Sequence, residues 1–263
     1  MGSATTQALS ATRAALNAAD LVDIDTAREL FAAARVIGDV SHLSGALADP
    51  TAPPASRTRL VTDVFGSQFS KATVSLLTTA SAQRWSRAAD LVASIEETAI
   101  RAAAIAEPGV DIEGELFAVS QIVAGDPELE LALGSRLGDP ALKGALASKL
   151  FDGRVSAATA LIVSSLVQQP RERRVRELLS FAMRTVTDQR DRMVATVVTA
   201  TPLSAAQADR LSTALAKKYG RDVALNAIID PSVVGGLRVQ IADDIIDGSI
   251  SGRLADLRQR LAG

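Results

Sequence analysis

The sequence predicts a mainly α-helical protein, in which two tandem helical bundles precede a small α+β module of β-α-β-β-α order. Hydrophobic residues make up 48% of the 263 residues, but aromatic residues only 3%. Such a core must be built from Ala, Leu, Val and Ile on closely packed helices, which favours bundles. Helical patterns fill roughly the first 190 residues, whereas from Met193 the apolar residues alternate as they do in strands.

The first predicted bundle spans residues 1–105 and consists of helices separated by turn-forming residues. Asp25 or Thr26 can cap its second helix, because their side-chain oxygens accept a hydrogen bond from a free backbone N–H of the first turn. Three prolines between residues 50 and 54 end that helix, since proline lacks the backbone donor and restrains the residue before it. The expected helices are about 4–19, 26–47, 55–65, 70–83 and 86–106.

A repeat of 86 residues runs through the helical region. The segment Glu-Leu-Phe-Ala at 29–32 reappears at 115–118. Chance agreement between alanine-rich segments is the alternative, but prolines, phenylalanines and a Ser-x-Ala-Thr element recur in the same register. We therefore predict two copies of one bundle, residues 1–105 and 100–190, which share the helix near 86–106. Further matched pairs are Leu43 and Leu129, Leu47 and Leu133, Pro54 and Pro140, Phe65 and Phe151, Ser70 and Ser156, Thr73 and Thr159, and Gln83 and Gln169.

The last helix of the second bundle has the clearest amphipathic pattern in the chain. Its apolar residues recur at steps of three and four, so they form one stripe along the helix. The stripe consists of Val175, Leu178, Leu179, Ala182, Met183 and Val186.

The C-terminal module, residues 191–263, is predicted from alternating apolar residues and from turn chemistry. Ser204 and Gln207 form a capping box that starts a helix. Gly220 suits the left-handed cap that ends this helix. From Ile250 the period becomes helical again, and the stripe consists of Ile250, Leu254, Leu257 and Leu261. The expected strands are about 193–200, 223–229 and 237–241.

Charge and cysteine content exclude several classes of protein. The formal net charge is −2 and the pI about 5.6, so no overall positive field attracts nucleic acid or anionic lipid. The absence of cysteine excludes disulfides and thiolate metal sites. No apolar run reaches the ~20 residues needed to span a bilayer, and the N-terminus lacks the features of a secretion signal. We expect a soluble protein that works at a membrane only through a partner.

No catalytic, metal or cofactor site is predicted. The single histidine, His42, lies among helical positions where a filler role is far commoner than that of a base. The aspartates within 243–247 lack the oxygen-ligand spacing of a calcium loop. The glycine pair at 235–236 precedes a strand, whereas phosphate-binding glycines open a helix. Trp85 is expected to be buried in the first bundle.

One basic cluster stands out, and it consists of Arg171, Arg173, Arg174 and Arg176. Two glutamates are interleaved with it and no aromatic residue is available to stack on bases, so a solvated helix start is expected rather than an RNA site. Positive charges at a helix start oppose the helix dipole. An acidic partner at this cluster is therefore the alternative that stays open.

The C-terminal residues carry a family resemblance. Asp-Pro-x-x-x-Gly-Gly at 230–236 is followed by a strand and then by Ile-Asp-x-Ser at 246–249, before the leucine-striped helix. This pattern resembles the delta subunit of bacterial rotary ATP synthase, the family of the mitochondrial oligomycin-sensitivity-conferring protein. The resemblance covers about the last seventy residues. Ala242-Asp243 departs from it, because the family commonly has a glycine before its acidic residue.

The helical region resembles the same family more weakly, through the helix starts Pro54-x-x-Arg57 and Pro140-x-x-Lys143. Common family members have one bundle and a shorter chain, whereas this sequence has two predicted bundles. The second is expected to be the usual one, because it adjoins the C-terminal module.

The resemblance implies a stator subunit without a catalytic site or cofactor, peripheral at the cytoplasmic face of the cell membrane. The family's helical domain grips N-terminal segments of the alpha subunits at the top of the catalytic head, and its C-terminal module engages the membrane-anchored b subunit. We expect an alpha-subunit helix to enter an apolar bundle groove. The groove residues expected are Val175, Leu178, Ala182, Leu91 and Ile95, and those expected to contact the b subunit are Ile250, Leu254, Leu257 and Leu261.

Three other function classes stay open at this point: a helical adaptor of another multisubunit complex, a small enzyme and an RNA-binding protein. The adaptor is the strongest of them, because the sequence offers many helical faces and no convergent catalytic groups. An RNA-binding protein would show affinity that falls steeply with salt.

Overall fold

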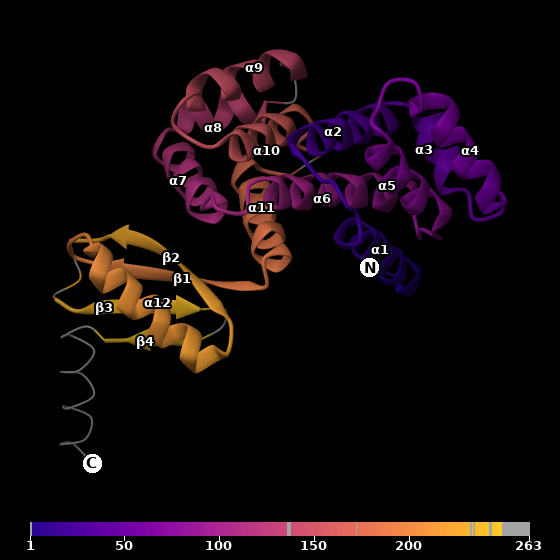
Figure 1. The fold of residues 1–263 in the computed structure, drawn as a ribbon. Helices are drawn as coiled ribbons and strands as arrows, with labels where there is room; N and C mark the ends of the chain where they lie inside the picture. The colour runs from indigo at the N-terminus through magenta and orange to yellow at the C-terminus, as the bar shows by residue number, and fades with distance from the viewer. Residues whose placement is uncertain are drawn as a thin grey trace. The chain divides into compact units, whose positions relative to one another are not determined.

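The computed structural model describes residues 2–135, 138–171, 173–231, 233, 235–241 and 244–248. The chain divides into two compact units, Met1–Val186 and Thr187–Gly263 (Figure 1). The first unit is helical and the second contains a small mixed sheet. The predicted fold class, mainly α with a C-terminal α+β module, is confirmed.

The first unit consists of helices joined by short connections, and capping side chains set several of their starts. Asp23, Ser70, Asp111 and Ser156 each accept a hydrogen bond from a backbone N–H in the first turn of the helix that follows. The helices are α1 (Ser3–Asn17), α2 (Ile24–Asp39), α3 (Ser41–Ala48), α4 (Pro54–Phe65), α5 (Lys71–Ala82), α6 (Ala88–Ala106), α7 (Ile112–Gly125), α8 (Pro127–Gly134), α9 (Pro140–Phe151), α10 (Ala157–Gln168) and α11 (Val175–Gln189).

One predicted helix, 26–47, is two helices in the structure. Val40 has an extended backbone, with φ −106° and ψ 94°, and separates α2 from α3. The apolar positions on both sides of Val40 keep the helical spacing, so the periodicity alone could not reveal the break.

The 86-residue spacing between matched positions of the sequence is also the spacing between corresponding helix starts and ends. α3 and α8, α4 and α9, and α5 and α10 each begin and end 86 residues apart. Matched side chains are also buried alike, because Phe65 and Phe151 are 2% and 1% exposed and Leu47 and Leu133 are 1% and 0% exposed. The interpretation of this register as two copies of one bundle stays a prediction.

A long-range hydrogen-bond contact is repeated at the same spacing. The Glu29 carboxylate on α2 accepts hydrogen bonds from the Ser70 backbone N–H at 2.9 Å and from the Ser70 hydroxyl at 2.8 Å. On α7, the Glu115 carboxylate accepts from the Ser156 N–H at 3.0 Å and from its hydroxyl at 2.6 Å. Each glutamate therefore ties its helix to the start of the third helix after it.

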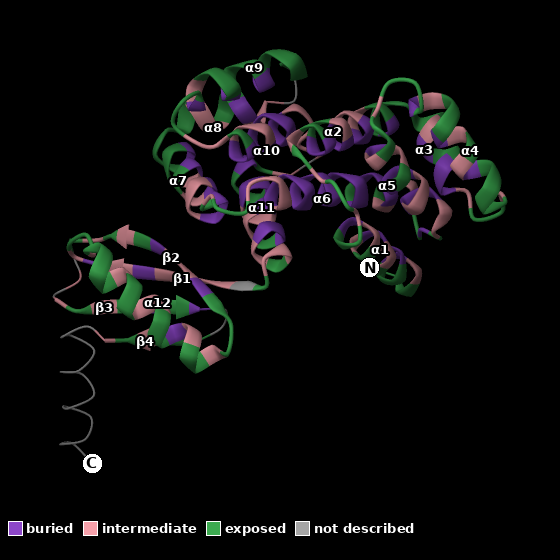
Figure 2. Cartoon of the chain, viewed as in Figure 1, coloured by how far each residue is buried: buried purple, intermediate pink, exposed green. Residues whose placement is uncertain are grey.

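The central element of the first unit is α6, which packs against α1, α2, α3, α5 and α10. Thirteen of its 19 residues are buried, and Figure 2 shows the buried colour along most of its length. A helix that is covered on all sides needs apolar or small residues around its whole circumference. Its second half meets that need through Ala99, Ile100 and the alanines at 102–104, while the buried Arg101 pairs with Glu97.

One hydrophobic core runs through the first unit from Ala8 to Val186, and α6 lies within it. Trp85 belongs to this core at 4% exposure, and its indole N–H donates to the Ala80 carbonyl at 2.8 Å. Its predicted burial is confirmed. The division into bundles at 1–105 and 100–190 stays a prediction, since both share this core.

The second unit is a four-stranded sheet in the order β2-β1-β3-β4, with α12 across one face (Figure 1). β1 pairs in parallel with β2 and antiparallel with β3, and β3 pairs antiparallel with β4. Leu215 of α12 packs with strand residues such as Val197 and Val239 to form a separate core. The elements are β1 (Arg192–Thr199), α12 (Ala205–Tyr219), β2 (Asp222–Ile229), β3 (Leu237–Ile241) and β4 (Asp244–Asp247).

The turn chemistry predicted for this unit is present. Ser204 and Gln207 form a reciprocal capping box, and Gly220 has φ 72° as the left-handed cap of α12. Gly235 and Gly236 both have positive φ, 64° and 79°. The strand β4 was not predicted, because two of its four residues are aspartates that indicate turns. The predicted last helix, from Ile250, lies outside the described residues.

The repeated glutamate contact gives a stability prediction. We expect Glu29→Ala and Glu115→Ala each to lower the free energy of unfolding by about 1–2 kcal/mol, because each leaves hydrogen-bond donors at a helix start unsatisfied. Urea unfolding followed by circular dichroism measures this, with Asp20→Ala in an exposed turn as the control. Losses no larger than that of the control would contradict a structural role for the two glutamates.

The capping aspartate of α2 predicts a pH dependence. The Thr26 backbone N–H, and then the Thr26 hydroxyl, hold the pKa of Asp23 below its usual value. A carboxylate with a lowered pKa stabilises the fold above its unfolded pKa, and that stabilisation is lost as the pH falls through the folded pKa. We expect Asp23→Ala to cost about 1 kcal/mol at neutral pH.

The cost of Asp23→Ala should shrink as the pH falls below the unfolded pKa of an aspartate, ~3.9, toward the lower pKa of the folded Asp23 carboxylate. Urea unfolding at neutral and acidic pH measures the difference between the two proteins. Asp23→Asn is the matched control, since asparagine caps without titrating. A difference that does not change with pH would show that the charge of Asp23 is irrelevant.

Candidate interaction surfaces

The groove residues expected from the sequence lie in the core of the first unit. Leu91 and Ile95 on α6 are 0% and 2% exposed, and Val175, Leu178 and Ala182 on α11 are 1%, 0% and 0% exposed. A partner helix would have to displace one of the unit's own helices to reach most of these side chains. Their contact with an alpha subunit stays a prediction.

The residues expected to contact a b subunit lie outside the described part of the chain. These residues are Ile250, Leu254, Leu257 and Leu261. Their role also stays a prediction.

Three exposed leucines, which the sequence analysis did not single out as a surface, lie on α8 and α9. Leu131 on α8 is 74% exposed, and Leu142 and Leu146 on α9 are 69% and 43% exposed. The positions 86 residues before Leu131 and Leu142 hold Gly45 and Ser56. Comparison of the two repeats position by position could have found this difference.

The arginine cluster is held to α6 by one buried carboxylate. Glu96, with a side chain 5% exposed, accepts from Arg173 Nη2 at 2.5 Å and lies 3.5 Å from Arg171 Nη2. Arg173 also lies over the Phe181 ring, 5.1 Å from its centre. The predicted solvated helix start is correct for Arg174 and Arg176, which are exposed, but not for these two.

Burial lowers the pKa of Arg171, and the neighbouring cation Arg173 adds to this effect, while the Glu96 carboxylate opposes it. An arginine stays charged at any physiological pH, so its partial burial must be compensated by an opposite charge. Arg171 also has a positive φ of 46°. The segment between α10 and α11 thus depends on Glu96 for its position.

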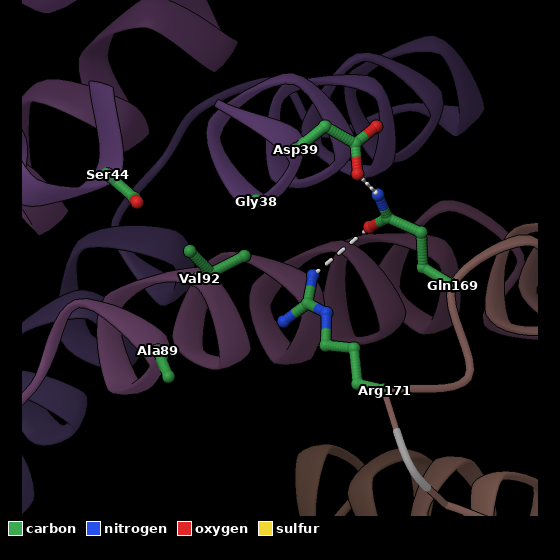
Figure 3. Close-up of a pocket in the computed structure, with 7 residues that line it drawn as sticks. All are labelled: Gly38, Asp39, Ser44, Ala89, Val92, Gln169 and Arg171. Carbon is green, nitrogen blue, oxygen red and sulfur yellow. Dashed lines mark hydrogen bonds between the residues drawn. The ribbon is translucent and has the colours of Figure 1, made fainter. Parts of the chain in front are cut away.

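A cleft of about 380 Å³ lies where this segment meets the end of α2 and the start of α6 (Figure 3). Gln169 Nε2 donates to Asp39 Oδ1 at 2.7 Å, and Arg171 Nη2 donates to Gln169 Oε1 at 3.3 Å. These two hydrogen bonds connect Arg171, after α10, through Gln169 to Asp39 at the end of α2. The residues that line the cleft are Gly38, Asp39, Ser44, Ala89, Val92, Gln169 and Arg171.

The described residues contain no group of three or more histidine, aspartate or glutamate side chains that could hold a metal ion. His42, the single histidine, is exposed at the start of α3. None of the described helices is long and apolar enough to cross a membrane.

Comparison with known proteins identifies the family. The model of the OSCP family, described as ATP synthase delta (OSCP) subunit, matches residues 98–261, which is more than half of the chain. The chain belongs to the ATP synthase delta (OSCP) subunit family. The match begins within α6, so the OSCP model covers the second repeat and the C-terminal unit but not the first repeat.

Relatives of this family match along almost the whole chain. The ATP synthase subunit delta of Leifsonia xyli is 48% identical over 100% of both chains. The protein of the same name from Streptomyces avermitilis is 39% identical over 98% of both chains, and that from Thermobifida fusca is 38% identical over 89% of both. The first repeat is therefore shared with these delta subunits, although the family model omits it.

The ion pairs of Glu96 give a further stability prediction. We expect Glu96→Gln to lower the free energy of unfolding by about 1–3 kcal/mol, because two half-buried arginines lose their counter-charge. Glu130→Gln is the matched control, since Glu130 pairs with Arg176, whose side chain is 53% exposed. An exposed pair contributes at most about 1 kcal/mol. Urea unfolding measures both, and equal losses would refute the anchoring role of Glu96.

Proposed function

We propose that this chain is a stator subunit of proton-translocating ATP synthase, which links the alpha subunits at the top of the catalytic head to the membrane-anchored b subunit. The observation that carries the proposal is family membership: the delta-subunit model matches residues 98–261, and full-length relatives carry the name ATP synthase subunit delta. In this role the chain has no catalytic site. It is peripheral at the cytoplasmic face of the cell membrane and is held there by its partners.

The construction of the first unit supports a mechanical role. A stator must resist the torque of the rotor, and a body with one continuous core deforms less than helices joined by loops. The buried α6 and the repeated Glu29 and Glu115 contacts join helices of the unit that are not consecutive in sequence. The second unit has its own core, which suits a separate contact with a second partner.

We propose that the second repeat is the main grip on the alpha subunits. Two observations support this: the family model begins within α6 and so includes the second repeat, and the exposed leucines Leu131, Leu142 and Leu146 lie there. Covering an exposed leucine with a partner is favourable, because apolar surface is removed from water. The last predicted helix of the chain is proposed to contact the b subunit.

Substitutions in the full chain test this contact with the alpha subunits, whereas deletion of the first repeat would disrupt the shared helix α6. We expect Leu142→Glu, at a side chain 69% exposed, to weaken binding to the purified catalytic head by about tenfold, because a charge would be buried against an apolar partner. Ser56→Glu is the matched control, at the equivalent helix position of the first repeat. Binding is measured by biolayer interferometry, and thermal unfolding confirms that both variants fold.

If both variants bind the catalytic head equally weakly, the first repeat also contacts the head. If neither variant loses affinity, the main contact with the head lies elsewhere on the chain. The alternative function, a helical adaptor of another complex, predicts no binding of the wild-type chain to the alpha or b subunits. A pull-down with these two chains distinguishes it.

A further inference from the structure

Two connections occupy equivalent places in the helical unit, one between α5 and α6 and the other between α10 and α11. α5 and α10 end 86 residues apart, at Ala82 and Gln168. The next residue is a glutamine in both, and the backbone N–H groups of Gln83 and Gln169 donate at 3.2 Å to carbonyls of the preceding turn. The two connections therefore begin alike, and the contacts that hold them can be compared residue by residue.

The connection between α5 and α6 is held by an apolar anchor and by an arginine of its own repeat. The Trp85 side chain is buried in the core at 4% exposure. Arg57 of α4, which is also buried, donates from Nη1 to the Gln83 carbonyl at 2.6 Å and from Nη2 to the Ala82 carbonyl at 3.2 Å. Burial of an indole does not depend on charge, so we expect this connection to stay closed at low and at high salt.

Different residues stand at these positions in the connection between α10 and α11. Arg171 lies 86 residues after Trp85, and Lys143 lies 86 residues after Arg57. Lys143 Nζ donates to the Ser135 carbonyl at the end of α8, at 2.8 Å. Arg171 has a φ of 46°, in the left-handed region that disfavours residues with a Cβ. This connection therefore has a charged residue in an unfavourable backbone conformation where the other connection has its apolar anchor.

Two carboxylates, on α6 and α2, hold the connection between α10 and α11 instead. Glu96 of α6 accepts from Arg173 Nη2 at 2.5 Å and lies 3.5 Å from Arg171 Nη2. Asp39, at the end of α2, accepts from Gln169 Nε2 at 2.7 Å (Figure 3). We refer to Gln169, Arg171 and Arg173 as the latch. Its side chains reach α2 and the shared helix α6, so the latch joins the two halves of the helical unit.

The closed latch is held by contacts that water can replace. The side chains of Arg171 and Arg173 are 26% and 29% exposed. When these cations leave Glu96, their hydration offsets much of the lost attraction. Release of the connection also relieves the left-handed backbone of Arg171. The neighbouring helices depend on the close-packed core, whose opening costs far more free energy than that of a surface segment.

We propose that the latch is a charge-held conformational device, which opens and closes while α10, α11 and the core stay folded. When closed, it fixes the start of α11 to α6 and to the end of α2. When open, it withdraws Gln169 and Arg171 from the lining of the cleft in Figure 3. The two halves of the unit then remain joined through α6 and the core. The proposal goes beyond the stator role, because it assigns a moving part to the helical unit and requires no partner.

Hydrogen exchange of the full chain, followed by mass spectrometry and resolved to single amides, tests the proposal. The Gln169 and Gln83 N–H groups make the same bond in the two connections, so Gln83 is an internal reference. We expect Gln169 to exchange about tenfold faster than Gln83 and than the interior of α10. Raising the salt from about 50 mM to about 500 mM should speed exchange at Gln169 about threefold and leave Gln83 unchanged, because salt screens the pairs with Glu96.

Variants at the two carboxylates identify the contacts that hold the latch. Glu96→Gln keeps the shape of the side chain but removes its charge, and we expect exchange at Gln169 to become about tenfold faster without a change in the interior of α10. Asp39→Asn keeps an acceptor for Gln169, so exchange about threefold faster is expected. Glu96→Asp keeps the charge, and its exchange rate should lie closer to that of the wild type than the rate of Glu96→Gln does.

Asp90→Asn is the matched control in the other connection. Asp90 pairs at 2.8 Å with Arg87, which lies 86 residues before Arg173. Since Trp85 anchors that connection, loss of the Asp90 charge should change exchange at Gln83 by less than about twofold. Thermal unfolding shows whether each variant folds, and the salt series on the wild-type chain tests the latch without any variant.

Three results would overturn the proposal. One is exchange of Gln169 at the same rate as the interior of α10, because the latch would then open only when the whole unit unfolds. Another is an equal response of Gln169 and Gln83 to salt. The third is a loss of protection at Gln83 in Asp90→Asn as large as the loss at Gln169 in Glu96→Gln, because both connections would then depend on charge.

Discussion

The burial of α6 on all its sides from Ser94 to Ala104 is the constraint on which the rest of the first unit depends. Helices of both repeats pack against it, so any charge along its buried length must find a partner inside the protein. Glu97 pairs with Arg13 of α1 at 2.7 Å and with Arg101, one turn further along α6, at 2.8 Å. Glu96 pairs with Arg173 instead, so two adjacent glutamates tie α6 to opposite ends of the helical unit's sequence.

The position of Glu96 explains why the arginine cluster is divided. Arg171 and Arg173 turn toward the buried carboxylate, and this brings Gln169 to Asp39 at the end of α2. Arg174 follows Arg173 directly and is exposed. One buried anion thus holds the connection between α10 and α11 near the end of α2, while Arg174 stays at the surface.

Local sequence signals predicted most helices and strands, but they did not predict which apolar and charged side chains are exposed. The capping box at Ser204 and the left-handed Gly220 were visible because each depends on a few neighbouring residues. The five groove candidates were chosen from helical stripes, and a stripe has the same period whether it faces the core or a partner. The pairing of Arg173 with Glu96 joins positions 77 residues apart, so no local pattern could reveal it.

The positions matched by the 86-residue register differ in how strongly the structure constrains them. A close-packed core constrains residue volume, and Phe65 and Phe151 are identical and both buried, although the buried pairs Val61 and Ala147, and Ala80 and Leu166, differ. Exposed pairs are free of that constraint, and Ser56 corresponds to the exposed leucine Leu142. A large apolar side chain costs free energy where it faces water, unless a partner covers it. The difference at Leu142 therefore changes the surface of α9 relative to that of α4, while one continuous core joins both halves of the helical unit.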